Sequence, residues 1–247
     1  MLSKRGACSR TEAARWIRAG RVAVDGHVVV DPEWPFQGEA ATITVDGEPL
    51  AAIARRYIAL NKPRGLVTTV ADDRDRDTVY RCLDGASLPW LAPVGRLDRA
   101  SEGLLLFCND PAWAARLTDP ATGPDKTYHV QVDAIPEAAR LEAMVAGVDA
   151  DGERLHAKSA RLLRTGTRNA WLEVVLDEGR NRHIRRMLQA EGFAVRRLVR
   201  VAIGPVLLGD LPKGAWRPLT DGEIASLAPA SAEPPPRKPR PARDRPG

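Results

Sequence analysis

An aspartate between two arginines is the part of this sequence that most strongly suggests chemistry. Asp98 lies in the polar segment 95–99, shortly before the apolar run 103–107. Because that run predicts a strand buried on both faces, the segment should be a loop at the edge of a rigid scaffold, where reactive groups are common. The cations of Arg96 and Arg99 favour the ionised form of the acid. Asp98 is therefore a candidate catalytic carboxylate, although a single aspartate in a loop more often only forms a turn.

A basic stretch at 178–192 could bind phosphate. Asn181 can cap a helix there and Gly192 can end it. At helical spacing the inward face consists of Ile184, Met187 and Leu188, and the neighbouring polar stripe of Arg182, Arg185 and Gln189. Seven arginines and one acid lie between Gly179 and Arg200. So one-sided a charge suits phosphate binding better than a merely solvated helix face.

The segment 126–132 alternates between polar and apolar residues, as expected for a half-buried strand. It contains Tyr128, one of only three tyrosines. The ring could stack on a base or fill the core, and filling the core is the default interpretation.

The composition argues against several kinds of site. The three cysteines (Cys8, Cys82 and Cys108) are widely spaced and no C-x-x-C occurs, which argues against disulfides and zinc. The four histidines show no metal-ligand spacing, so we expect neither a metal nor another cofactor. No apolar run approaches the roughly 18 residues of a membrane span, and no signal-peptide region begins the chain. We therefore expect a cytoplasmic protein without a membrane partner.

The charge is consistent with an anionic partner. The net charge is +5, and 31 of the 37 basic residues are arginine, whose planar fork fits phosphate. High genomic G+C content would also raise the arginine count. No large apolar stripe is left over for an interface between copies, so we expect a monomer.

Residues 1–50 predict a small separate module. Ser9 and Glu12 form a capping box that should open a helix, and β-rich stretches flank the turn at Asp25 and Gly26. Its basic residues include Arg10, Arg15, Arg18 and Arg21. These could contact an anionic partner or simply form a solvated face.

Residues 56–228 predict the main domain. Strand-like stretches lie at 57–60, 102–107, 126–132, 170–176 and 195–199, and helix-like stretches at 111–117, 136–145 and 181–190. Because they do not alternate regularly, we expect an α+β fold with a mixed, mainly antiparallel sheet and flanking helices. The Pro/Arg-rich tail at 229–247 cannot form a core and is expected to be disordered, either solubilising the protein or loosely contacting its partner.

Four ordered motifs in the main domain resemble those of the RsuA-type pseudouridine synthases. They are Y-I-A-L-N-K-P-R-G at 57–65, G-R-L-D at 95–98 followed by G-L-L-L, K-T-Y at 126–128 and E-G-R-N-R-H-I-R-R-M-L at 178–188. The N-terminal C-S-R-T-E-A and G-R-V-A-V-D-G resemble the αL RNA-binding module often fused to these enzymes. The ordered set spans nearly everything before residue 229 and is far more specific than any one motif.

The resemblance implies an isomerase (an intramolecular transferase) that modifies RNA. Such an enzyme breaks the bond between the uracil nitrogen and the ribose, turns the base and rejoins it through carbon five, after flipping the uridine out of the RNA stack. It implies that Asp98 is the essential carboxylate, that Arg185 pairs with it and that Tyr128 stacks on the uracil. Further substrate contacts are expected from Arg96, Arg99, Arg182, Arg186 and Leu188, the last closing the apolar side of the pocket. The match at Asn61, Lys62 and Pro63 is expected to be mainly structural.

Two departures from the family pattern stand out. His183 replaces the usual glutamine, so a hydrogen bond behind the site should differ. Residues 1–4 leave room for only the last turn of the helix that usually begins an αL module, so either the start codon lies upstream or the module is truncated.

The expected substrate is ribosomal RNA, free or in an assembling subunit, and thus the expected role is rRNA processing. The S-E-G at 101–103 and the N-R-H-I-R-R-M at 181–187 favour the large subunit. The main alternative is a non-catalytic RNA-binding factor for ribosome assembly. The intact set of Asp98, Tyr128 and Arg185 argues against it, since a degenerate relative would not need all three.

Overall fold

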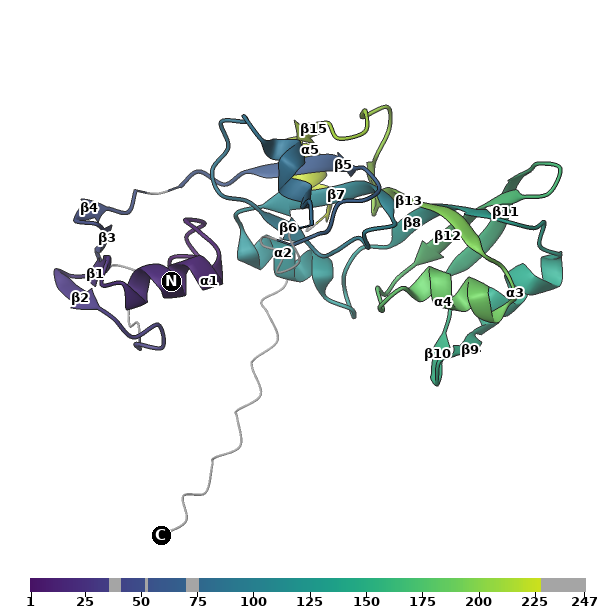
Figure 1. Ribbon diagram of the computed structural model, residues 1–247, viewed down its shortest axis with the longest axis horizontal. Helices are drawn as coiled ribbons and strands as arrows, with labels where there is room; N and C mark the ends of the chain where they lie inside the picture. The colour runs from purple at the N-terminus through teal and green to yellow at the C-terminus, as the bar shows by residue number, and fades with distance from the viewer. Residues whose placement is uncertain (36–40, 52, 70–75, 228–247) are drawn as a thin grey trace, which may run out of the picture.

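The computed structural model describes residues 1–35, 41–51, 53–69 and 76–227. These residues form a small N-terminal module, at the left of Figure 1, and a larger domain of helices and strands. The prediction of an α+β fold with an N-terminal module is confirmed. The predicted tail at 229–247 lies outside the described residues.

The N-terminal module combines one helix with a four-stranded antiparallel sheet. The helix is α1 (Arg10–Arg18), and the strands are β1 (Val22–Val24), β2 (His27–Val29), β3 (Ile43–Val45) and β4 (Glu48–Pro49), in the order β2-β1-β3-β4. As the capping box predicts, the Ser9 hydroxyl accepts a hydrogen bond from the Glu12 amide at 3.0 Å. Asp25 and Gly26 both have positive φ and turn the chain between β1 and β2.

The main domain is built on a nine-stranded sheet with the principal order β11-β12-β8-β13-β7-β5-β15. Its strands are β5 (Tyr57–Lys62), β6 (Ala92–Val94), β7 (Glu102–Cys108), β8 (Lys126–Val132), β11 (Ser159–Thr165), β12 (Ala170–Leu176), β13 (Val195–Ile203), β14 (Val206–Leu207) and β15 (Trp216–Pro218). Among the strands described for this sheet, only β13 and β7 pair in parallel. The sheet is therefore mixed and mainly antiparallel, as predicted.

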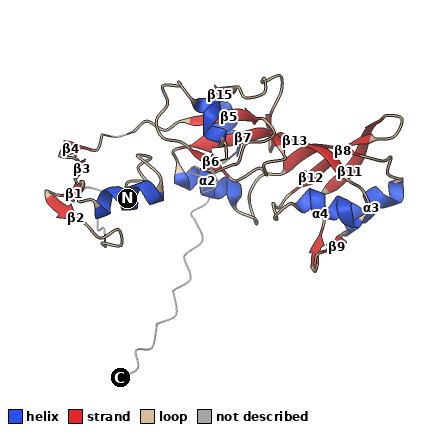
Figure 2. Ribbon diagram, viewed as in Figure 1, coloured by secondary structure: helices blue, strands red, loops and turns tan. Residues whose placement is uncertain are grey.

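Helices pack at both ends of this sheet. Helices α3 (Ala138–Ala146) and α4 (His183–Ala190) lie on one side of β8, β11 and β12, with the hairpin of β9 (Val148–Ala150) and β10 (Glu153–Leu155) below them (Figures 1 and 2). At the other end, α2 (Pro111–Thr118) meets α5 (Asp221–Leu227), where the Trp113 indole donates to the Ile224 carbonyl oxygen at 3.3 Å. A 3-10 helix, η1 (Val79–Leu83), packs beside β5.

Strand β7 carries a hydrophobic layer on each face. All of its residues are buried, as the unbroken apolar run predicts. Leu105 and Phe107 belong to a cluster that includes residues of β8, β12 and α4, whereas Leu104 and Leu106 belong to a cluster with α2 and α5. Because successive side chains point to opposite faces, β7 is held from both sides. The strand therefore fixes the end of the loop that precedes it.

Two local predictions differ from the structure. The helix predicted to start at a cap by Asn181 starts instead at His183, because Arg182 adopts a left-handed φ of 50° at the capping position and no side chain caps the helix. Strand β11 was not predicted, because most of its side chains are exposed on the sheet edge and show no regular alternation.

Candidate active site

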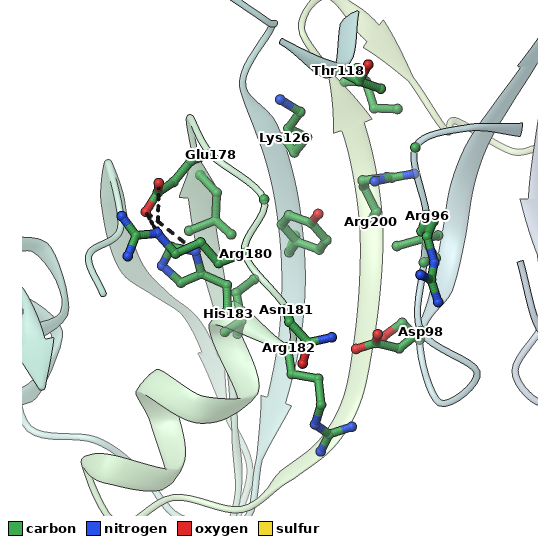
Figure 3. A pocket seen from close by; sticks show the side chains of 18 of the residues that line it. Arg96, Asp98, Thr118, Lys126, Glu178, Arg180, Asn181, Arg182, His183 and Arg200 are labelled. Carbon is green, nitrogen blue, oxygen red and sulfur yellow. Dashed lines mark hydrogen bonds and ion pairs between the residues drawn. The ribbon is translucent and has the colours of Figure 1, made fainter. Parts of the chain in front are cut away.

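A cavity of about 570 Å³ opens between β8, β13, the segment 94–98 and the segment that leads into α4. This volume lies within the range of roughly 300–1,000 Å³ that is usual for small-ligand pockets. Four of the residues predicted to form the site line it together, namely Arg96, Asp98, Tyr128 and Arg182 (Figure 3 labels three of them). The fold thus brings the second, third and fourth sequence motifs to one place.

The segment around Asp98 is held almost entirely through its backbone. Each carbonyl oxygen from residue 97 to residue 101 accepts a hydrogen bond from a residue outside the segment. The donors, in order, are the Thr68 hydroxyl (2.8 Å), the Lys62 ammonium (3.2 Å), the Gly65 amide (2.8 Å), the Arg185 guanidinium (3.0 Å) and the Lys62 ammonium again (2.8 Å). With every carbonyl bonded, the loop has little freedom to move.

Lys62 is the main anchor of this loop. It is fully buried, and its Nζ donates to the carbonyl oxygens of Pro63, Asp98 and Ser101, so all three N–H groups of the ammonium are used. Burial is the main cause that lowers the pKa of Lys62 to about 8, and the Asp98 charge opposes it. The motif at Asn61, Lys62 and Pro63, which was expected to be mainly structural, therefore positions the Asp98 loop through Lys62.

The side chain of Asp98 is left available. It is half-buried and lines the cavity, and Figure 3 shows its carboxylate pointing across the gap toward Asn181 and Arg182. Within the described part of the chain, no hydrogen bond or ion pair engages its carboxylate oxygens. A rigid backbone with an unengaged carboxylate facing a cavity is what a catalytic acid requires.

Tyr128 belongs both to the core and to the wall of the cavity. It is 9% exposed and packs in the main hydrophobic cluster, yet it also lines the cavity. On the neighbouring strands it lies opposite Val174 and Arg200. Its ring is therefore held in place by the core while one part stays open to a ligand.

Arg185 reaches the candidate acid's loop differently from the prediction. Its guanidinium donates to the carbonyl oxygens of Ala100 at 3.0 Å and Val195 at 3.4 Å. Burial is the main cause that lowers the pKa of Arg185, and the Asp98 charge opposes that shift, so the two groups attract each other. The described structure contains no direct ion pair between them: Nη1 and Nη2 donate to the two carbonyls, and Nε has no partner among the described residues. Instead of the expected ion pair with the Asp98 carboxylate, Arg185 binds the backbone of the same loop at Ala100.

Two predicted contacts on α4 lie outside the cavity. Leu188, expected to close the apolar side, is completely buried in the core, and Ile184, one turn earlier, lines the cavity instead. Arg186 binds the carboxylates of Asp151 and Glu153 at 2.8 and 2.6 Å. It therefore fastens α4 to the β9–β10 hairpin.

Arg99 also lies away from the cavity. Its side chain is exposed, and its carbonyl oxygen accepts the hydrogen bond from the Gly65 amide. Of the arginines expected at the substrate, only Arg96 and Arg182 are in the cavity lining.

Three cations of the cavity were not predicted as site residues: Arg180, beside the predicted Arg182, and two on strands. Lys126 and Arg200 both line it, on the adjacent strands β8 and β13. Lys126 could have been found, since it lies two residues before Tyr128 and period-two alternation puts both on one face. Arg200 could not, because the predicted strand ended one residue earlier.

His183 forms the buried wall opposite these cations. It is 3% exposed, lines the cavity and has no hydrogen-bond partner at either ring nitrogen among the described residues. Burial is the main cause that lowers its pKa below the usual 6.5, against the attraction of Glu178, whose Oε1 is 3.9 Å from Nδ1. The residue at which the sequence was expected to differ from the resembled family thus places a buried imidazole at the cavity wall.

The four arginines predicted to contact RNA from the N-terminal module (Arg10, Arg15, Arg18 and Arg21) are exposed. Arg15 pairs with Glu12 at 3.0 Å, and Arg21 pairs with Asp46 while lying over the Trp16 ring. Arg10 and Arg18 form no ion pair within the described residues. Those two are the most available for an anionic partner.

Within the residues that the structure describes, no group of three or more His, Cys, Asp or Glu side chains is arranged to hold a metal ion. In the same residues, no helix is long and apolar enough to span a membrane.

Comparison with known families follows the division seen in the structure. A model of the family described as RNA pseudouridylate synthase matches residues 56–190, and a model of the S4 domain matches residues 1–41. The first match contains the Asp98 loop, β8, β12 and α4.

Individual proteins match over almost the whole chain. An uncharacterized RNA pseudouridine synthase of Aquifex aeolicus is 36% identical over 228 residues, covering 92% of this chain and 91% of that protein. One from Mycobacterium bovis is 38% identical over 232 residues, again covering 92% and 91%. A crystal structure of a pseudouridylate synthase aligns with a TM-score of 0.65 and 32% identity, covering 92% of this chain and 96% of that one.

Proposed function

The chain belongs to the RNA pseudouridine synthases, and from this premise we propose that it isomerises specific uridines of ribosomal RNA with Asp98 as the catalytic carboxylate. The observation that supports Asp98 most strongly is the contrast between its backbone and its side chain. Every carbonyl of residues 97–101 is bonded, while the carboxylate is unengaged and faces the cavity. Such preorganisation lowers the entropic cost of bringing an acid to a reacting nucleoside.

The other residues of the cavity fit the remaining needs of the reaction. The glycosidic bond must break, the base must turn while it stays bound, and carbon five must finally lose a proton. The Tyr128 ring offers a flat surface on which uracil can stack, and its hydroxyl is a candidate for the final proton transfer. Arg185 would keep the loop in place through its hydrogen bond to the Ala100 carbonyl oxygen, and its charge attracts that of Asp98.

Access to the cavity requires the uridine to leave the RNA stack. Arg96 and Arg182 lie at the cavity and are exposed, so they are positioned to meet the extruded nucleotide and its neighbours. Unstacking costs a few kcal/mol, and phosphate contacts offset it. Arg10 and Arg18 of the N-terminal module would add such contacts away from the cavity.

The test is the Asp98→Asn variant on ribosomal RNA from a strain lacking the gene. We expect pseudouridine formation to be lost, while the melting temperature and RNA affinity stay close to those of the wild type. Asp84→Asn is the matched control, because Asp84 is an exposed carboxylate outside the cavity lining. Wild-type rates in Asp98→Asn would refute the proposed mechanism.

Mapping pseudouridines in both ribosomal subunits of wild-type and deletion strains tests the substrate. We propose a large-subunit uridine, supported by the S-E-G and N-R-H-I-R-R-M segments. If the deletion strain lacks a pseudouridine in the small subunit instead, the substrate is a small-subunit uridine. An assembly defect with every site present would instead support a non-catalytic RNA-binding factor.

A further inference from the structure

Arg200 is a buried cation whose bonding capacity is only partly used. It is 5% exposed and lines the same cavity as Asp98. Its Nε donates to the Leu104 carbonyl oxygen at 2.7 Å, whereas its buried Nη2 has no hydrogen-bond partner among the described residues. Leaving a buried charged donor unpaired is costly, so a missing acceptor is the simplest account of this side chain.

Lys126 is a second cation in the same condition. It lines the cavity, is only partly exposed, and its ammonium has no hydrogen bond or ion pair in the described part of the chain. Burial is the main cause that lowers the pKa of Lys126, and the charge of Arg200 lowers it further. Of the nearby acids, Asp125 is already bound by Lys158 at 2.8 Å. The charges of Asp125 and Asp177 oppose this shift, but neither acid forms an ion pair with Lys126 in the described part of the chain.

The two cations have a defined position relative to Tyr128. On the adjacent strand, Arg200 lies directly opposite Tyr128. Lys126 lies two residues before Tyr128 on the same strand, which places it about 7 Å along and on the same face. Figure 3 shows Lys126 and Arg200 on neighbouring strands, with Arg200 between Lys126 and Asp98 and its guanidinium near Arg96. A base against Tyr128 would thus have Arg200 beside it on the neighbouring strand and Lys126 farther along its own strand.

We propose that Lys126 and Arg200 form a subsite for a phosphodiester group of the RNA, next to the part of the cavity that holds the uracil. The inference rests on the proposed function, since it assumes that a nucleotide enters this cavity. A phosphate suits the pair because two cations without a directly bound acid favour an anion with several acceptor oxygens, which can bind a guanidinium and an ammonium. Every nucleotide of RNA supplies such a group at a fixed distance from its base.

The subsite also has a consequence for binding. A phosphate held by two largely buried cations is screened less by salt than one on the surface, and it fixes the strand on one side of the uridine. Binding energy gained there can offset the cost of unstacking the base. Lys126 and Arg200 would therefore help to hold the flipped state without touching the reacting bond.

The experiment measures RNA binding rather than turnover, so that it does not depend on catalysis by Asp98. The full-length Asp98→Asn protein is titrated with ribosomal RNA from a deletion strain over a range of salt concentrations. Adding Lys126→Gln should weaken binding about tenfold. It should also reduce the slope of log affinity against log salt by about 0.7, the share of one phosphate contact on a single strand. Lys213→Gln is the matched control, because Lys213 is exposed, lies outside the cavity lining and pairs with Glu102, which Arg197 also holds, so it should leave both quantities unchanged.

Competition identifies the source of the phosphate. Uridine 5′-monophosphate should displace RNA from the Asp98→Asn protein at a concentration about tenfold lower than uridine does, and Lys126→Gln should abolish this difference. Inorganic phosphate alone should compete weakly. If it competes as well as the nucleotide, the pair holds a free anion and the proposal fails.

An unchanged affinity and salt slope in Lys126→Gln would overturn the subsite. Arg200→Gln should have the same effects and provides a second variant. If the Arg200→Gln protein does not fold, the result for Lys126→Gln decides between the outcomes. Turnover of the wild-type protein on the same RNA is recorded separately. A wild type without turnover would therefore count against the proposed function and not against the phosphate subsite.

Discussion

The buried ammonium of Lys62 donates a hydrogen bond to the carbonyl oxygen of Asp98 at 3.2 Å, across 36 residues of sequence. The same ammonium binds the carbonyl of Ser101 at 2.8 Å. One side chain therefore closes both ends of the loop that presents the candidate acid. The position of the carboxylate depends on a residue that never faces the substrate.

Replacing Lys62 by methionine tests this positioning role. Lys62→Met leaves three carbonyls without their donor, so the loop should loosen and kcat should fall by about tenfold or more, with a smaller change in KM. The melting temperature should fall only slightly, because removing a buried charge offsets part of the stability lost with the hydrogen bonds. Steady-state kinetics and thermal unfolding measure both, with Lys158→Met as the control. A purely structural role predicts instead a lower melting temperature with a normal kcat in the folded fraction.

Adjacent arginines on α4 should behave differently. Arg185→Lys loses the fork that holds the Ala100 carbonyl, so we expect kcat to fall about tenfold or more while the protein stays folded. Arg186→Lys loses bonds to the β9–β10 hairpin, so we expect a lower melting temperature and a normal kcat. Kinetics and unfolding of both variants check this contrast. Equal effects on kcat would mean that Arg185 has no special link to the Asp98 loop.

The Tyr128 hydroxyl can be tested apart from its ring. Tyr128→Phe keeps the stacking surface, so KM should change little, whereas loss of a proton-transfer group should lower kcat by about 100-fold or more. Tyr80→Phe is the matched control: its hydroxyl binds the Leu91 carbonyl at 2.8 Å, and the residue is outside the cavity lining. The control should lose stability and keep its kcat. A normal kcat in Tyr128→Phe would restrict Tyr128 to stacking.

The buried His183 should make stability depend on pH. Burial lowers its pKa in the folded protein below 6.5, so the unfolded chain binds a proton more readily below that pH. The free energy of unfolding should therefore fall as the pH drops below about 6.5, and His183→Gln should remove that part of the loss. Melting temperatures at pH 7.5 and pH 5.5 measure it, with the exposed His27→Gln as the control. The same loss in both variants would assign the effect to other groups.

Much of the fold could be predicted because the order of apolar and polar residues along a segment indicates which of its faces are buried. The apolar run of β7 predicted a strand buried on both faces, and the alternation of β8 predicted one open face. The ordered motifs predicted that Asp98, Tyr128 and Arg182 belong to one site, and all three line the cavity. Strand β11 was missed because an exposed edge strand needs no regular alternation.

The sequence alone determined the basic character and the class of fold, because these depend on residue types and on periods of a few residues, and the resemblance of its motifs to a known family pointed to the candidate acid and the tyrosine. Only the tertiary structure decided what holds them. It assigned Arg185 to the Ala100 carbonyl 85 residues away, Arg186 to a hairpin, and Arg200 to the cavity with an unpaired guanidinium nitrogen. The order of strands in the sheet sets these contacts, and a local pattern shows which face of an element is buried without showing which element covers it.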